Sequence, residues 1–247
     1  MNAAAGSWFE RLSICLHLVF LIGAPSVLIT RAIFYAYHPE NFVDSSPTIS
    51  ETASHPPASD FFLGTMILVT ACIAVSWSLN ITRNRYRLGL LAAQGMKVAG
   101  PMLLAGIASV LGIAAGFWLA TVSVYTLNNG HDVHMMGSWA FYICQALSIT
   151  LDILFVLWMR RLAPSPFSDD RLWQRIAVAA GIFLGSWFFL YMYLSKDFAA
   201  PENRYAIQLV YVGAEYLVAL LFLIYPMTAY AEMRRHFREF AGDERKD

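Results

Sequence analysis

The sequence predicts an all-α polytopic membrane protein, a bundle of six transmembrane helices. Of the 247 residues, 58% are hydrophobic and only 14% are charged, whereas a soluble domain has about 45–50% apolar and about 25% charged residues. The apolar residues gather in runs that lack Asp, Glu, Lys and Arg and approach or exceed the about 20 residues of a membrane-crossing helix. Charges this sparse exclude a cytosolic enzyme, because they cannot cover the surface of a soluble protein.

Six apolar runs predict six helices in a single domain that spans residues 1–247. The expected helices cover residues 11–34, 61–81, 98–124, 135–159, 174–195 and 206–230. The first run contains Pro25 and has no small-residue cleavage site before Arg31, so we expect a retained helix and not a removable signal peptide. Residues 231–247 are expected to form a short cytoplasmic tail.

The distribution of basic residues predicts that both termini are cytoplasmic, since cytoplasmic loops carry an excess of Lys and Arg. With the N-terminus inside, fourteen of the 17 basic residues lie on the inner side: Arg11, Arg83, Arg85, Arg87, Lys97, Arg160, Arg161, Arg171, Arg175, Arg234, Arg235, Arg238, Arg245 and Lys246. The membrane itself, a bacterial inner membrane or a eukaryotic plasma membrane or endomembrane, is not decided by the sequence.

Three ionisable residues lie deep in the predicted helices, where a central charge costs roughly 2.5–3.5 kcal/mol and therefore usually faces the bundle interior. They are His17, Asp152 and Glu215. At 1.5 Å per residue, His17 and Asp152 lie about 9 and about 10 Å from the inner face. They would pair if the first and fourth helices are neighbours; otherwise backbone or hydroxyl groups satisfy each of them. Glu215, about 14 Å deep, is either neutral or paired in an inner cavity.

The outer side carries a second polar group, the His-Asp-Val-His segment at residues 131–134. The spacing of three places His131 and His134 on one helical face, and Asp132 suits a helix N-terminus. One interpretation is a cap with interfacial histidines. The alternative is a divalent metal bound by the two histidines. A third ligand would come from the long outer loop: Glu51, Asp60 or His55. No other cofactor is predicted.

The long outer loop, residues 35–60, contains the adjacent pair Ser50 and Glu51. A Glu51 carboxylate beside Arg31, at the outer end of the first helix, would form a charge-assisted pair. The same loop has room to fold into the mouth of the bundle. These residues and the histidines therefore define one candidate pocket on the outer side.

The chain resembles the DRAM/Frag/Sfk family of six-helix membrane proteins. The residues that carry the resemblance are Ile49-Ser50-Glu51-Thr52-Ala53, Pro56-Pro57, Phe61-Phe62 and His131-Asp132-x-His134. The family includes the damage-regulated autophagy modulators and is related to the N-terminal region of the yeast cell-wall protein that acts in GPI-anchor lipid remodelling. It often has Gly where this chain has Ala53. The resemblance implies a lipid-linked role without a shared catalytic mechanism.

These observations support two main functional hypotheses, and the sequence favours the non-enzymatic one. In the first, the protein handles or senses lipid by binding a head group in an outer-leaflet pocket lined by Arg31, Ser50, Glu51, His131, Asp132 and His134. In the alternative, the same cluster serves a lipid hydrolase or acyltransferase, with Ser50 or a metal-bound water as nucleophile, a histidine as base and Asp132 or Glu51 as the orienting acid. A third hypothesis is a proton-coupled transporter centred on Glu215.

The expected partner is membrane lipid, with a membrane-protein partner left open. Nucleic acid is not an expected partner, because 17 Lys and Arg balance 17 Asp and Glu and leave no bulk positive field.

Overall fold

The computed structural model describes residues 3–40, 46–163, 171–198 and 200–243, and these contain helices and no strand. The helices are α1 (Ala3–Leu12), α2 (Cys15–Tyr37), α4 (Ile49–Thr52), α5 (Ala58–Ala93), α6 (Ala99–Val124), α7 (His131–Leu162), α8 (Leu172–Ser195) and α9 (Arg204–Asp243). Two short 3₁₀ turns, η2 (Lys196–Phe198) and η3 (Pro201–Asn203), lie between α8 and α9.

Six helical segments in these ranges are long and apolar enough to cross a membrane, which confirms the predicted fold class. The first of them, Gly6–Tyr37, includes the end of α1 and all of α2, and the others correspond to α5, α6, α7, α8 and α9. The chain is therefore an integral, multi-pass membrane protein.

Two helices extend well beyond their predicted ends. The helix expected to end near residue 81 continues to Ala93, and the one expected to end near residue 230 continues to Asp243. Arg83 and Arg87 suggested a loop, because arginines are costly in an apolar helix. In the structure both lie inside α5 and are buried against Glu232 of α9, so their charges are compensated without ending the helix.

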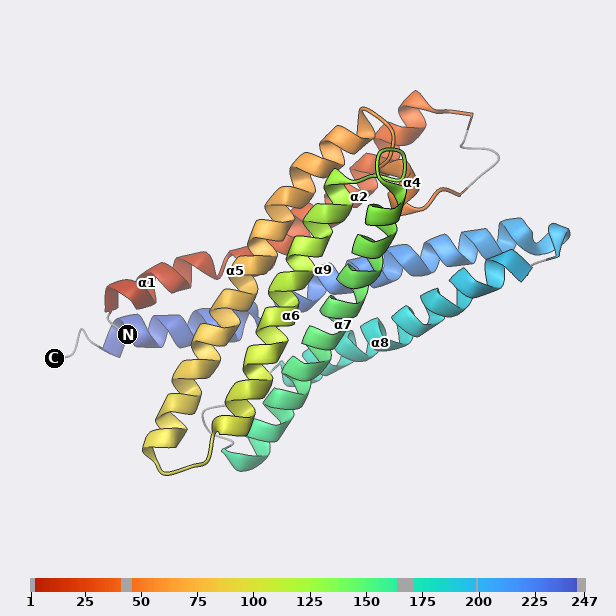
Figure 1. The fold of residues 1–247 in the computed structure, drawn as a ribbon. Coiled ribbons are helices and arrows are strands. Elements are labelled where there is room, and N and C mark those ends of the chain that lie inside the picture. The colour runs from red at the N-terminus through yellow and green to blue at the C-terminus, as the bar shows by residue number, and fades with distance from the viewer. Residues whose placement is uncertain (1–2, 41–45, 164–170, 199, 244–247) are drawn as a thin grey trace.

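The arrangement of the helices defines two ends of the bundle (Figure 1). Both chain termini lie at one end, called here the termini end; α4 and the α6–α7 connection lie at the opposite end, called the loop end. Helix α6 packs against α5 and α7, and α2 packs against α5 and α9. Helix α8 packs mainly against α9, as does α1. Because α2 packs against α9, the segment that follows α2 lies within reach of α9 at the loop end.

Small residues allow close contact between neighbouring helices. Gly112 of α6 lies against the indole of Trp77 on α5, where a Cβ atom would overlap the ring. One turn later, Thr70 Oγ1 donates a hydrogen bond of 3.2 Å to the carbonyl oxygen of Gly116. Such contacts stabilise helix pairs in lipid, where water provides no hydrophobic driving force.

Candidate functional site at the loop end

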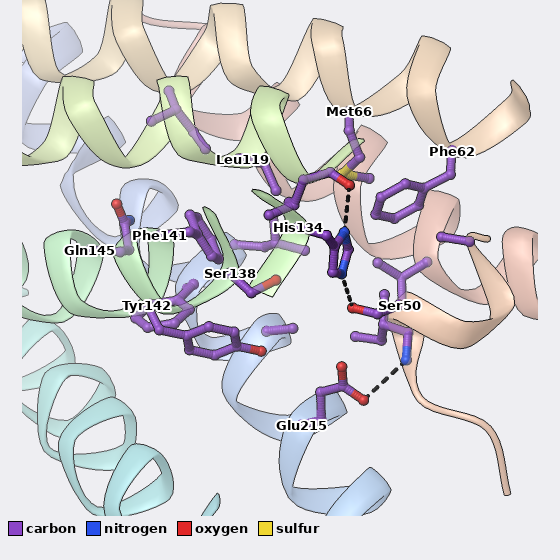
Figure 2. A pocket seen from close by; sticks show the side chains of 18 residues that line it. Ser50, Phe62, Met66, Leu119, His134, Ser138, Phe141, Tyr142, Gln145 and Glu215 are labelled. Atoms are coloured by element: carbon purple, nitrogen blue, oxygen red, sulfur yellow. Dashed lines mark hydrogen bonds between the residues drawn. The ribbon is translucent and has the colours of Figure 1, made fainter. Parts of the chain in front are cut away.

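A cavity of about 90 Å³ lies inside the bundle near the loop end. Its walls are mostly apolar side chains from five helices, namely Val27 of α2, Met66 of α5, Leu119 of α6, Phe141 of α7 and Phe222 of α9. Ser50, His134 and Glu215 border it on the side of α4 (Figure 2). Ser138, Tyr142 and Gln145 of α7 add polar groups elsewhere in the lining (Figure 2). The cavity is thus a mostly apolar space with one group of polar side chains beside α4 and another along α7.

Helix α4, which carries Ser50, is a single turn fixed by its own sequence. The Thr48-Ile-Ser-Glu51 segment forms a capping box: Thr48 Oγ1 accepts a 3.0 Å hydrogen bond from Glu51 N–H, and Glu51 Oε2 accepts one of 2.6 Å from Thr48 N–H. This reciprocal pair satisfies two of the N–H groups that every helix start leaves unpaired. Glu51 is exposed, and its carboxylate serves the backbone of α4.

Distant residues hold α4 at the bundle. Glu215 of α9 is 6% exposed, and its Oε2 accepts a 3.0 Å hydrogen bond from Ile49 N–H. Ser54 Oγ accepts a 3.2 Å hydrogen bond from Leu127 N–H, and Asn128 Nδ2 donates one of 2.8 Å to Ser54 O, both from the α6–α7 connection. The loop segment is therefore attached to α9 and to the α6–α7 connection, beside the cavity.

His134 of α7 makes the contact that most resembles a chemical site. Its Nε2 lies 2.9 Å from Ser50 Oγ, and its Nδ1 lies 2.6 Å from Tyr125 O and 3.1 Å from Val122 O. Carbonyl oxygens only accept hydrogen bonds, so Nδ1 carries the proton. In the neutral ring Nε2 is then the acceptor, and the Ser50 hydroxyl donates to it.

Arg31 contacts the loop backbone instead of Glu51. Its guanidinium donates to Pro47 O at 3.1 Å, to Tyr35 Oη at 3.0 Å and to Ser46 Oγ at 3.3 Å. The expected Arg31–Glu51 pair therefore does not form. The Glu51 carboxylate accepts a hydrogen bond from Thr48 N–H, and Arg31 holds the segment that leads into α4.

His131 and Asp132 are exposed at the start of α7, whereas His134 is only 4% exposed. Residues three apart differ by about 60° around a helix, and at this position that rotation separates the bundle interior from its outside. Of the six predicted site residues, the structure brings Ser50 and His134 together at the cavity. In the described parts of the chain, no group of three or more His, Cys, Asp or Glu residues could hold a metal ion.

His17 and Asp152, which were expected to pair only if the first and fourth helices were neighbours, have different partners. Asp152 of α7 accepts hydrogen bonds from Asn80 Nδ2 at 2.9 Å, Arg175 Nη2 at 2.5 Å and Tyr225 Oη at 2.7 Å. The His17 ring packs edge-on against Tyr230, with 3.9 Å between ring centroids. The condition for their pairing is not met, because α2 packs on α5 and α9, and the partners of Asp152 come from α5, α8 and α9.

A second buried polar centre, called here the arginine cluster, consists of Arg83, Arg87, Arg175, Asp152 and Glu232. Glu232 lies 3.2 Å from Arg83, 2.6 Å from Arg87 and 3.3 Å from Arg175. Each of these five residues is less than 10% exposed. In the sequence these arginines indicate only topology, and Glu232, an acid in a mostly basic stretch, is the available signal that they have an internal partner.

Comparison with known proteins supports the family resemblance seen in the motifs. No curated protein and no solved structure matches the chain. A family profile described as the Frag1/DRAM/Sfk1/Cwh43P N-terminal domain matches residues 8–236. That range runs from the first membrane span into the last and includes the whole loop-end cavity. Since nearly the entire chain matches this one profile, the protein belongs to the Frag1/DRAM/Sfk1/Cwh43P N-terminal domain family.

Proposed function

We propose that this protein binds a membrane lipid at the loop-end cavity. An apolar part of the lipid lies against the cavity walls, and a polar group of the same lipid approaches Ser50, His134 and Glu215. The observation that carries the proposal is the cavity itself, an apolar space inside the bundle with three polar side chains on its α4 side. Ligand sites commonly combine apolar walls with a few placed polar groups.

The size of the cavity limits what enters it. At about 90 Å³ it takes a short segment of a lipid and excludes a whole molecule. Most of the lipid therefore stays in the bilayer beside the bundle. Apolar cavities hold apolar groups readily because water gains few hydrogen bonds in them.

The exposed residues near α4 provide the surface for the head group in this proposal. Glu51 follows Ser50 in the chain, and His131 and Asp132 precede His134 by three and two residues. Glu51, His131 and Asp132 are exposed. Arg31 acts indirectly, by fixing the chain that leads into α4. The predicted head-group residues thus divide into those that would meet lipid and one that positions the loop.

A photocrosslinking experiment tests the proposal. The full-length protein is reconstituted in phosphatidylcholine vesicles that contain phosphatidylcholine with a diazirine in its acyl chain, and adducts are mapped by peptide mass spectrometry. The Ala219→Phe variant fills the cavity, which Ala219 borders. The Ala206→Phe variant is the matched control, because Ala206 is exposed on the same helix.

We expect adducts on cavity-lining residues in the wild type and in Ala206→Phe, and at least a fivefold loss of these adducts in Ala219→Phe. Adducts confined to outward-facing residues, or equal cavity labelling in both variants, would overturn lipid binding at this site.

A further inference from the structure

The Ser50–His134 pair has the hydrogen-bond polarity of a nucleophile with its base. The Nδ1 proton is directed at Tyr125 O and Val122 O, so the Nε2 lone pair faces the Ser50 hydroxyl at 2.9 Å. In serine hydrolases a carboxylate usually selects this tautomer; here two carbonyl oxygens of the α6–α7 connection and the end of α6 do so. The opposite tautomer would leave Nδ1 facing two acceptors without a proton.

The same carbonyls would stabilise the charged ring during a reaction. When Nε2 takes a proton from Ser50, the positive charge spreads to Nδ1–H, which already donates to Tyr125 O at 2.6 Å. Hydrogen bonds from an ionised donor are stronger than neutral ones. His134 is held by these contacts within α7 and is 4% exposed, so its ring is oriented before any ligand arrives.

Ser50 borders the cavity that the proposed lipid segment enters (Figure 2). The side-chain oxygen of Ser50 and the ring of His134 both lie on the α4 side of that cavity. A lipid whose acyl chain enters the cavity would bring a carboxylic ester, the bond between its apolar and polar parts, toward Ser50.

Resting on the proposed lipid binding, we infer that the protein transfers acyl groups from ester-linked membrane lipids through Ser50. Ser50 Oγ attacks the ester carbonyl carbon while its proton moves to His134 Nε2. The bond between that carbon and the lipid alcohol oxygen breaks, and the leaving alcohol takes the proton from Nε2, which leaves an acyl ester on Ser50. Water or a second alcohol then attacks this ester, gives its proton to Nε2 and releases Ser50, which recovers the proton.

Two measurements on the reconstituted full-length protein test this inference. The first is labelling by a long-chain alkyl fluorophosphonate, which reacts with activated serines by losing fluoride. The second uses vesicles of phosphatidylcholine with a labelled acyl chain and lysophosphatidylethanolamine as acceptor. The product is labelled fatty acid if water discharges the acyl-enzyme, and labelled phosphatidylethanolamine if the acceptor does.

Three variants separate chemistry from folding. Ser50→Ala removes the nucleophile. His134→Gln retains a side chain that can hydrogen-bond to Ser50 but removes the base. Ser78→Ala, which removes an exposed hydroxyl of α5 that does not border the cavity, is the matched control. Thermal unfolding of each variant establishes that the bundle is intact.

We expect fluorophosphonate on Ser50 in the wild type and in Ser78→Ala, and none in Ser50→Ala. In His134→Gln, labelling and acyl release should fall by about 10²–10⁴-fold, the usual contribution of a general base. No adduct on Ser50 and no acyl product from wild-type protein would overturn acyl transfer. Retained diazirine labelling of the cavity in that case would leave lipid binding standing, so the two failures are distinguishable.

Discussion

The Glu215 carboxyl group on α9 accepts a 3.0 Å hydrogen bond from the backbone N–H of Ile49, which lies 166 residues earlier in the chain. This bond joins the last membrane helix to the first residue of α4. It accounts for a carboxyl group that is 6% exposed within a membrane-spanning helix, because a buried polar group needs a hydrogen-bond partner. Glu215 therefore positions the loop that carries Ser50.

Replacing Glu215 by Leu should destabilise the protein by about 1–3 kcal/mol, the cost of leaving the partly buried Ile49 N–H unsatisfied. Glu215→Gln should cost less, because its amide oxygen still accepts from Ile49 N–H. Thermal unfolding in detergent micelles measures both. If Leu and Gln are equally tolerated, the hydrogen bond from Ile49 N–H to Glu215 does not hold α4.

The capping box of α4 predicts a coupling between Thr48 and Glu51. Each of Thr48→Val and Glu51→Ala should cost about 0.5–2 kcal/mol, the range found for helix caps. Each change removes one of the two hydrogen bonds that fix the same single helical turn, so the double variant should cost less than their sum. A double-mutant cycle of unfolding free energies checks this, and strict additivity would show that the two residues act independently.

The contact between α5 and α6 predicts opposite effects for two glycines of one helix. Gly112→Ala should destabilise the protein by about 1–3 kcal/mol, as overpacked sites do, because the new methyl group overlaps the Trp77 ring. Gly106→Ala is the control, since nothing lies within 4 Å of its added Cβ. It should be neutral or stabilise by up to about 1 kcal/mol through helix propensity. Comparable losses at both positions would contradict the tight contact.

The arginine cluster predicts a large effect of removing one acid. Glu232→Gln leaves Arg83, Arg87 and Arg175 with one fewer negative charge, and breaking a buried ion pair in this way costs about 3–5 kcal/mol. Glu239→Gln changes an exposed acid of the same helix and should shift the stability by at most about 0.5 kcal/mol. Unfolding curves of the two variants in detergent, measured side by side, decide whether Glu232 compensates the arginines.

The structure brings two of the residues predicted for the candidate site together and gives several others different partners from those expected. Ser50 and His134 were expected at one pocket, and the structure joins them across 84 positions of the chain. Glu51 was expected beside Arg31, but its carboxylate accepts a hydrogen bond from the N–H of Thr48, which is only three residues away in the chain. The Thr-x-x-Glu spacing was a legible capping signal, whereas no local pattern shows that Arg31 reaches Pro47 O.

The sequence by itself determined the fold class, the number of membrane spans and the family, because these depend on the length of apolar runs and on motifs that are local in the chain. Tertiary structure alone decided which polar groups meet. Depth along a helix follows from counting residues at 1.5 Å each, but the direction a side chain faces depends on which helices are neighbours. For this reason Asp152 binds Arg175 and not His17, and Arg83 and Arg87 lie inside a helix against Glu232.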